Sequence, residues 1–230
     1  MIRRTQVLAT IYAVFADWSA SRPWACRQGC ACCCTQNVTV TTPEALEIID
    51  FIRQHQMQEW LWARLAGDLQ PNRPRYTLNT MARASLARKE LAEEGVDFTS
   101  PCPFLDTNRC SLYPVRPFAC RSFLSRTPCT PDRPAEVDSG HLAAVTAVSQ
   151  LLEHFGQRQP WGNMLDLLEL LLKGNAPDSP AHRHTLRAQP FPGFLLTPDE
   201  ERQIGPCIQR ILAAKVGATT IEAILNGVGA

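Results

Sequence analysis

Apolar residues near the start of the chain recur at helical spacing between polar ones. Val7, Leu8, Ile11 and Phe15 fall on one face when the segment is wound as a helix. We therefore predict an amphipathic helix over residues 4–19. An apolar face of this kind is stable when it packs on a core, so this helix should lie against the body of the protein.

Two more helices are predicted before residue 100. Thr42-Pro43-Glu44 combines a capping residue, a proline in the first turn and an early acid, which is typical of a helix start. The apolar pattern that follows predicts a long helix over residues 43–66, stopped by Gly67. A further helix is expected over residues 78–94, where Gly95 would take the left-handed cap.

The C-terminal part also has a mainly helical pattern, and only Val38-Thr39-Val40 resembles a strand. The elements expected after residue 135 are a helix over residues 139–156, a helix over residues 161–172, a loop over residues 174–196, a helix from Thr197 interrupted near Gly205-Pro206, and a last helix over residues 219–226. The sequence therefore predicts a mostly α fold with little sheet.

Residues 99–134 have a different composition, with seven prolines and four cysteines among aromatic residues. Proline removes backbone donors and restricts the residue before it, so regular helix is largely excluded here. Side-chain packing, or a group bonded to the thiols, must hold such a segment in place.

Nine of the ten cysteines occur in two groups. The first places five thiols within residues 26–34, and the second is spread along the proline-rich segment. An adjacent pair such as Cys33-Cys34 does not easily form a disulfide, because its side chains leave the backbone in different directions. Crowded thiols of this kind suit a soft metal ion better. The sequence thus predicts an irregular helical domain with a Cys-rich, Pro-rich metal-binding loop region.

Composition limits the other function classes. A chain of 230 residues with 45% hydrophobic residues can bury a core without disulfides, so the clustered cysteines indicate a reducing, cytoplasmic location. The net charge is +1 and the arginines are dispersed, so nucleic acid is not an expected partner. No run of about 18 apolar residues occurs, and no membrane span is expected.

The cysteine spacing resembles a known family. The block C-x3-C-x2-C-C, followed by C-P-F-L and C-x-x-Y-x-x-R-P-x-x-C-R, is similar to the YkgJ-type cysteine-cluster proteins, which are described as zinc- or iron-chelating. The resemblance covers about residues 24–130. It implies metal ligation by Cys26, Cys30, Cys33, Cys34, Cys102, Cys110, Cys120 and Cys129. Cys32 has no counterpart in the family pattern and Cys207 lies outside it, so neither is an expected ligand.

Two arginines of the second block are candidates for contacts around the metal. Arg116 and Arg121 carry guanidinium groups that can offset thiolate charge by hydrogen bonding to sulfur. They can equally pair with Asp106 or cap a turn. By this interpretation residues 1–135 form a cysteine-cluster domain, and residues 136–230 form a C-terminal helical region packed on it as one structural unit.

The identity of the metal stays open, because four thiolates suit both tetrahedral Zn²⁺ and an iron–sulfur cluster. Two hypotheses follow. The first is a non-enzymatic chelator of zinc or iron, whose C-terminal helices offer a surface to a protein partner. The second is an iron–sulfur enzyme, such as a methyltransferase related to the flagellin lysine methylases, in which a related domain occurs.

Overall fold

The computed structural model describes residues 3–93, 95, 100–130, 132–174 and 180–227. About half of these residues are helical and the strands are short, which confirms the mostly α class. The elements up to residue 122 are α1 (Arg4–Ser19), β1 (Thr39–Thr41), α2 (Thr42–Gln54), α3 (Gln58–Leu65), α4 (Leu78–Leu86), β2 (Leu105–Asp106), β3 (Arg109–Cys110), the 3₁₀ helix η1 (Tyr113–Val115) and α5 (Phe118–Ser122). The later elements are α6 (Ser139–Phe155), β4 (Pro160–Asn163), α7 (Met164–Leu172), α8 (Pro180–Arg183), β5 (Leu186–Arg187), α9 (Pro198–Ala213), β6 (Lys215–Val216), β7 (Thr219–Thr220) and α10 (Ile221–Leu225).

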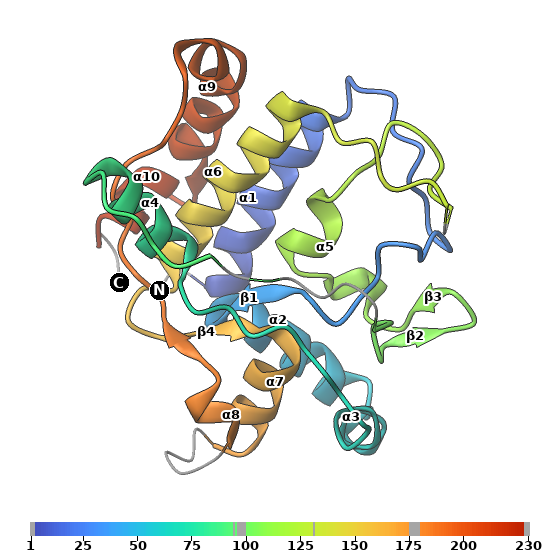
Figure 1. The fold of residues 1–230 in the computed structure, drawn as a ribbon. Coiled ribbons are helices and arrows are strands. Elements are labelled where there is room, and N and C mark those ends of the chain that lie inside the picture. The colour runs from blue at the N-terminus through green and yellow to red at the C-terminus, as the bar shows by residue number, and fades with distance from the viewer. Residues whose placement is uncertain (1–2, 94, 96–99, 131, 175–179, 228–230) are drawn as a thin grey trace.

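Two apolar clusters form the core. The first combines α1, α6, α9 and α10, with α1 and α6 side by side and α9 next to them (Figure 1). The second lies around α2 and α7 and includes the leucines of α7, which are core residues. The cysteine-rich segment inserts side chains into both clusters: Phe118 into the first, and Phe104 and Leu112 into the second. The two cores therefore hold this segment from opposite ends.

A three-stranded antiparallel sheet in the order β1-β4-β5 lies beside the second cluster. Val40 pairs with Gly162, so the predicted strand-like run at residues 38–40 does form a strand. Residues 161–163 were expected in a helix, but they belong to β4 and pair with both neighbouring strands. The helix α7 begins only at Met164, because the Asn163 side chain accepts the hydrogen bond of the Leu165 N–H and caps it.

The helix predicted over residues 43–66 is two helices, α2 and α3. Gln56 takes a left-handed φ of 56°, and the Met57 N–H bonds back to the Ile52 carbonyl at 2.9 Å. This turn redirects the chain so that Leu61 of α3 is fully buried. The prediction of one straight helix is therefore wrong, because the apolar face of α3 reaches the core only after the chain changes direction.

The helix predicted over residues 78–94 ends early, at Leu86. Arg88 adopts a left-handed φ of 52°, and the Lys89 N–H bonds to the Ala84 carbonyl at 2.8 Å, which together form a Schellman cap. Leu86 is already 48% exposed, so no core contact favours further turns. Gly95, the predicted cap, is therefore not the end of the helix, and residue 94 lies outside the described residues.

Three expectations for the C-terminal part are also wrong in detail. Helix α9 continues through Pro206, which is exposed and removes only one backbone hydrogen bond from the helix. The predicted loop over residues 174–196 contains α8 and β5, while residues 175–179 lie outside the described part. The final helix starts at Ile221, since Thr219–Thr220 forms strand β7 with β6.

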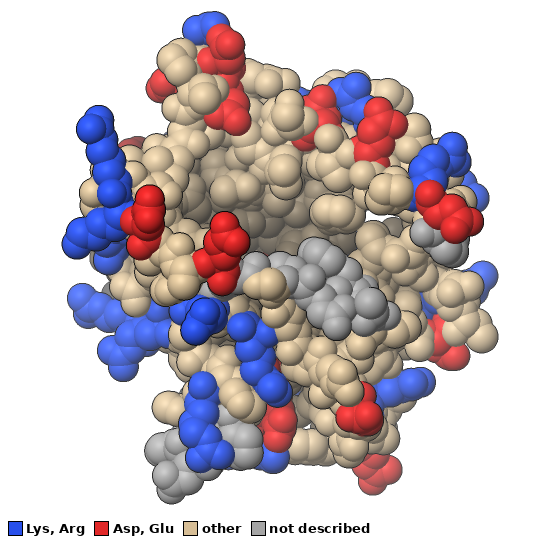
Figure 2. Space-filling model, in the orientation of Figure 1, with Lys and Arg blue, Asp and Glu red and all other residues tan. Residues whose placement is uncertain are grey.

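Charged side chains of both signs are scattered over the face shown in Figure 2, between larger areas of uncharged residues. Lys and Arg gather toward its left and lower left, with Asp and Glu side chains among them (Figure 2). On this face the positive residues are therefore mixed with acidic ones.

Candidate metal centre

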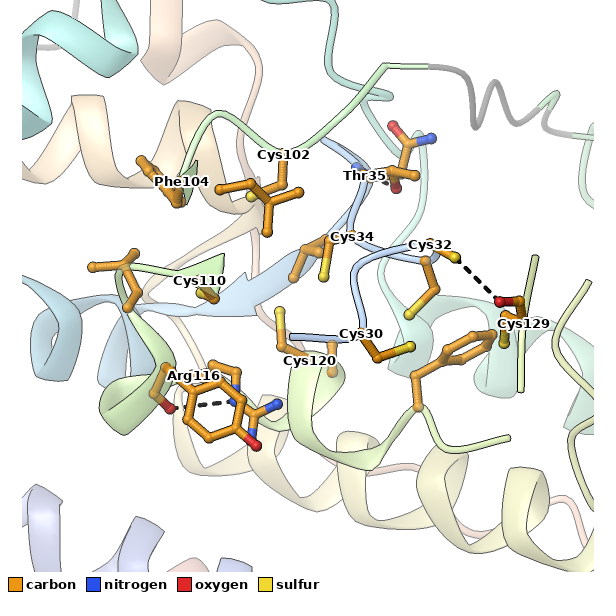
Figure 3. Close-up of a pocket in the computed structure, with 18 of the residues that line it drawn as sticks. Cys30, Cys32, Cys34, Thr35, Cys102, Phe104, Cys110, Arg116, Cys120 and Cys129 are labelled. Atoms are coloured by element: carbon orange, nitrogen blue, oxygen red, sulfur yellow. Dashed lines mark hydrogen bonds between the residues drawn. The ribbon is translucent and has the colours of Figure 1, made fainter. Parts of the chain in front are cut away.

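A cavity of about 640 Å³ brings the cysteines of the two blocks together. Its wall contains thiols from before residue 35 and from after residue 101, and Figure 3 shows several of them facing a common space. The cysteines that line it are Cys30, Cys32, Cys33, Cys34, Cys102, Cys110, Cys120 and Cys129. The expected non-ligand Cys32 is thus in the wall, whereas Cys26 is not.

Tight turns shape the first block. Gly29 has a φ of 93°, which a residue with a side chain rarely adopts, and the Cys30 N–H bonds to the Arg27 carbonyl at 3.0 Å. One turn later, the Cys34 N–H bonds to the Ala31 carbonyl at 3.0 Å. The block therefore folds back on itself, and its thiols are presented by a series of turns.

Backbone hydrogen bonds join the two blocks. The Cys102 N–H donates to the Cys34 carbonyl at 2.9 Å, and the Gln36 N–H donates to the Ser100 carbonyl at 3.0 Å. A short bridge pairs Thr35 with Pro101 between them. This pairing places Cys34 beside Cys102, which is 68 positions later in the chain.

The hairpin β2–β3 positions Cys110. Leu105 pairs with Cys110, and the Ser111 N–H bonds to the Phe104 carbonyl at 2.9 Å. Phe104 and Leu112 on either side are almost fully buried in the second core cluster. Because both flanks are anchored, Cys110 is held next to Cys102 at the edge of that core.

Helix α5 positions Cys120 through a buried carboxylate. Glu44 is only 4% exposed, and its Oε1 accepts hydrogen bonds from the Phe118 N–H and from the Tyr12 hydroxyl, both at 2.8 Å. At the other end of α5, the imidazole of buried His141 bonds to the Ser122 carbonyl at 2.7 Å. Residues from three other helices thus fix the short helix that carries Cys120.

Cys26 and Cys129 are tied to the segment that follows α5. The Ser125 N–H donates to the Cys26 Sγ at 3.2 Å, and the Ala25 N–H donates to the Ser125 carbonyl at 2.9 Å. The Cys32 thiol donates to the Cys129 carbonyl at 3.4 Å (Figure 3). These contacts close the outer side of the cysteine region.

The buried thiols of the second block favour their protonated form. Burial raises the pKa of Cys102 to about 11 and also raises the pKa of Cys110 and of Cys120. Cys34 differs, because a hydrogen bond with the Cys33 thiol lowers the pKa of Cys34 and raises that of Cys33. A metal that binds this set has to displace protons, so its affinity should rise with pH.

The donor set fits a thiophilic metal, because all ten cysteines are free thiols. Among the described residues, however, no three Cys, His, Asp or Glu side chains are arranged so that they can hold an ion as they stand. The thiols therefore have to close further around a metal.

The comparisons with known proteins agree with this chemistry. Residues 25–136 match the family model described as "CxxCxxCC: Putative zinc- or iron-chelating domain". The match covers 112 of the 230 residues and includes both cysteine blocks, and we call residues 25–136 the CxxCxxCC segment. No curated protein and no solved structure matches the chain. The CxxCxxCC segment contains nine of the ten cysteines and includes β2, β3 and α5.

Cys207 lies outside the CxxCxxCC segment and away from the cavity wall. Its side chain is fully buried in the first core cluster, where burial raises its pKa to about 11.

In the described part of the chain no helix has the length and apolar character that crossing a membrane requires.

The two arginines of the CxxCxxCC segment differ in position. Arg116 lines the cavity. Burial raises the pKa of Cys110, and the charge of Arg116 offsets part of that rise. Its Nε donates to the Tyr113 carbonyl at 3.2 Å, and its guanidinium lies 3.6 Å from the centre of the Tyr113 ring. Arg121 donates to the Arg116 carbonyl at 2.7 Å and lies over the Tyr12 ring. Each thus holds a turn through a carbonyl oxygen.

Glu44 and Ser125 are site residues that the sequence reading missed. Glu44 was recognised only as the early acid of a helix start, and nothing in the pattern links it to Phe118. Ser125 acts through its backbone N–H, which any residue other than proline would supply. Their contribution depends on contacts 74 and 99 positions apart in the chain.

Proposed function

We propose that this protein is a metal chelator that binds zinc or iron through the cysteines of its CxxCxxCC segment. The ligands would be Cys26, Cys30, Cys33, Cys34, Cys102, Cys110, Cys120 and Cys129. The observation that carries the proposal is the shared cavity, in which thiols from two distant blocks face each other. If this wall only packed the segments together, apolar side chains would be sufficient. Thiols that converge from two blocks are instead the donors that zinc and iron–sulfur sites use.

Arg116 supports this proposal from the cavity wall. Four or more thiolates carry a large negative charge, and a guanidinium beside them offsets part of it. Arg121 would act indirectly, by fixing the carbonyl of Arg116. We place this chemistry in the cytoplasm, because a reducing compartment keeps ten cysteines as free thiols. A protein partner at the C-terminal helices remains a prediction.

Elemental analysis of protein purified without oxygen tests the proposal. We expect bound zinc or iron, and Cys110→Ser should lower the metal content because a hydroxyl cannot replace a soft thiolate. Cys207→Ser is the matched control and should keep the full content, since that residue is buried in the helical core. A wild-type protein that holds no metal and takes up neither zinc nor iron would overturn the proposal.

The second candidate function is an iron–sulfur enzyme, and the size of the cavity favours it. A volume of about 640 Å³ is in the range of small-molecule sites, and Phe104, Leu112 and Met164 supply apolar wall. A methyl transfer of the kind carried out by flagellin lysine methylases would fit such a site. Colour separates the candidates, because an iron–sulfur cluster absorbs visible light and Zn²⁺ does not. A colourless zinc protein would argue against the enzyme.

A further inference from the structure

The eight cysteines proposed as ligands fall into two groups when their neighbours are compared. The Cys102 N–H donates to the Cys34 carbonyl at 2.9 Å, the Leu105 N–H donates to the Cys102 carbonyl at 3.2 Å, and Leu105 pairs with Cys110. Cys120 lies close enough to Cys34, Cys102 and Cys110 for their charges to interact. Cys102 in turn interacts with Cys110. We call these four cysteines the inner set. Figure 3 shows them together on the side of the cavity where Phe104 and Arg116 lie.

Cys30 has a different set of neighbours. Its charge interacts with those of Cys26, Cys33 and Cys129. We call Cys26, Cys30, Cys33 and Cys129 the outer set. Figure 3 shows Cys30 and Cys129 on the side away from Cys102, with Cys32 between them. Each set thus combines thiols from both sequence blocks, and each contains four.

The two sets meet at Cys33 and Cys34. These neighbours in the chain also share a hydrogen bond between their thiols. Consecutive side chains leave the backbone in different directions, so one residue can serve each set. An adjacent pair of cysteines therefore has a physical role here, because it divides the ligands of one loop between two centres.

We propose that the chain binds two metal ions in neighbouring four-thiolate sites, one formed by the inner set and one by the outer set. This inference rests on the proposed function and adds the number of sites and the division of their ligands. Zn²⁺ takes four ligands in a tetrahedron, so eight thiolates around a single ion would leave half of them unused. A second Zn²⁺ also offsets two more of the thiolate charges.

The two sites should differ in stability. Backbone pairing, hairpin β2–β3 and the Glu44 contact to α5 all support the inner set, and Cys102 and Cys110 pack against the second core cluster. The outer set depends on the turns around Gly29, and Cys33 is exposed. A chelator should therefore remove the outer ion first.

Zinc stoichiometry tests the division of the ligands. We choose substitutions away from the contact between the sets, Cys110→Ser for the inner set and Cys129→Ser for the outer set. Wild type should bind two zinc ions, each single variant about half as much, and the double variant none. If either single variant loses all zinc, or if wild type binds one ion only, the two-site proposal fails while the chelating function stands. If wild type binds no zinc or iron, the function itself fails.

A second measurement uses wild-type protein, so that misfolding of a variant does not obscure the result. Zinc-loaded protein is treated with enough chelator to remove half of the metal and is then alkylated with N-ethylmaleimide. Mass spectrometry should find the label on Cys26, Cys30, Cys33 and Cys129, with the inner set protected. Cys32 is labelled before and after chelation and serves as the internal control. Equal labelling of both sets at half removal would contradict the proposal.

Discussion

Replacing Glu44 by glutamine should destabilise the protein far more than a conservative change normally does. The carboxylate is 4% exposed and accepts four hydrogen bonds: two from Thr41, through its N–H at 3.0 Å and its hydroxyl at 2.9 Å, and one each from Tyr12 and Phe118. Glutamine keeps one acceptor oxygen and presents an NH₂ group to the remaining donors. In either orientation the NH₂ group faces one backbone N–H, that of Thr41 or of Phe118, which stays unpaired, and the hydroxyl beside it also loses its charged acceptor.

The size of the effect follows from these contacts. A hydrogen bond to a charged group contributes about 1.5–3 kcal/mol, so losing two should lower the free energy of unfolding by about 3–6 kcal/mol. At about 3 °C per kcal/mol for a chain of this length, the melting temperature should fall by about 9–18 °C. Scanning calorimetry of the metal-loaded wild type and of the metal-loaded Glu44→Gln variant measures this difference in melting temperature.

Glu47→Gln is the matched control on the same helix. Glu47 is paired with Arg4 at 2.8 Å, and both side chains are partly exposed, so its loss should cost less than about 1 kcal/mol. If Glu44→Gln melts within error of Glu47→Gln, the inference that Glu44 holds α5 and the start of α2 together is wrong.

Three further outcomes are expected. Cys207→Ser should lower the free energy of unfolding by about 1–3 kcal/mol, because a hydroxyl replaces a thiol in an apolar core. The variant should keep its full metal content, and a loss of metal would contradict the conclusion that Cys207 is a core residue and not a ligand. Burial lowers the pKa of His141, so as pH falls below about 6.5 the unfolded chain takes up a proton before the folded one, and the free energy of unfolding decreases. Denaturant titrations at pH 7.5 and 5.5 should therefore show a smaller decrease in the free energy of unfolding for His141→Gln than for wild type. Metal removal should speed hydrogen exchange across residues 100–130 and leave α6 unchanged, and equal exchange with and without a chelator would refute coupling between the metal and this segment.

Local signals were sufficient for the elements whose caps and burial agree. Helix α1 follows from its apolar face, and α2 starts where Thr41 and Glu44 form a capping box. The cysteine blocks were recognisable as a CxxCxxCC domain because their spacing is a property of the chain alone. In each case the deciding contacts lie within a few residues.

Long-range packing decided the rest. Gln56 takes a left-handed backbone angle that its residue type does not favour, because the chain must change direction there to follow the core. The left-handed angle of Arg88 closes the cap of α4 where the helix has left the core. Trp161 is in a strand because β1 lies beside it, and not because of its neighbours in sequence. The position of Cys32 in the cavity wall likewise depends on where Cys129 is brought by its own segment. Sequence spacing can list the thiols, but their grouping around a metal depends on distances between segments that are about 70 to 100 residues apart, and folding of both cores sets those distances.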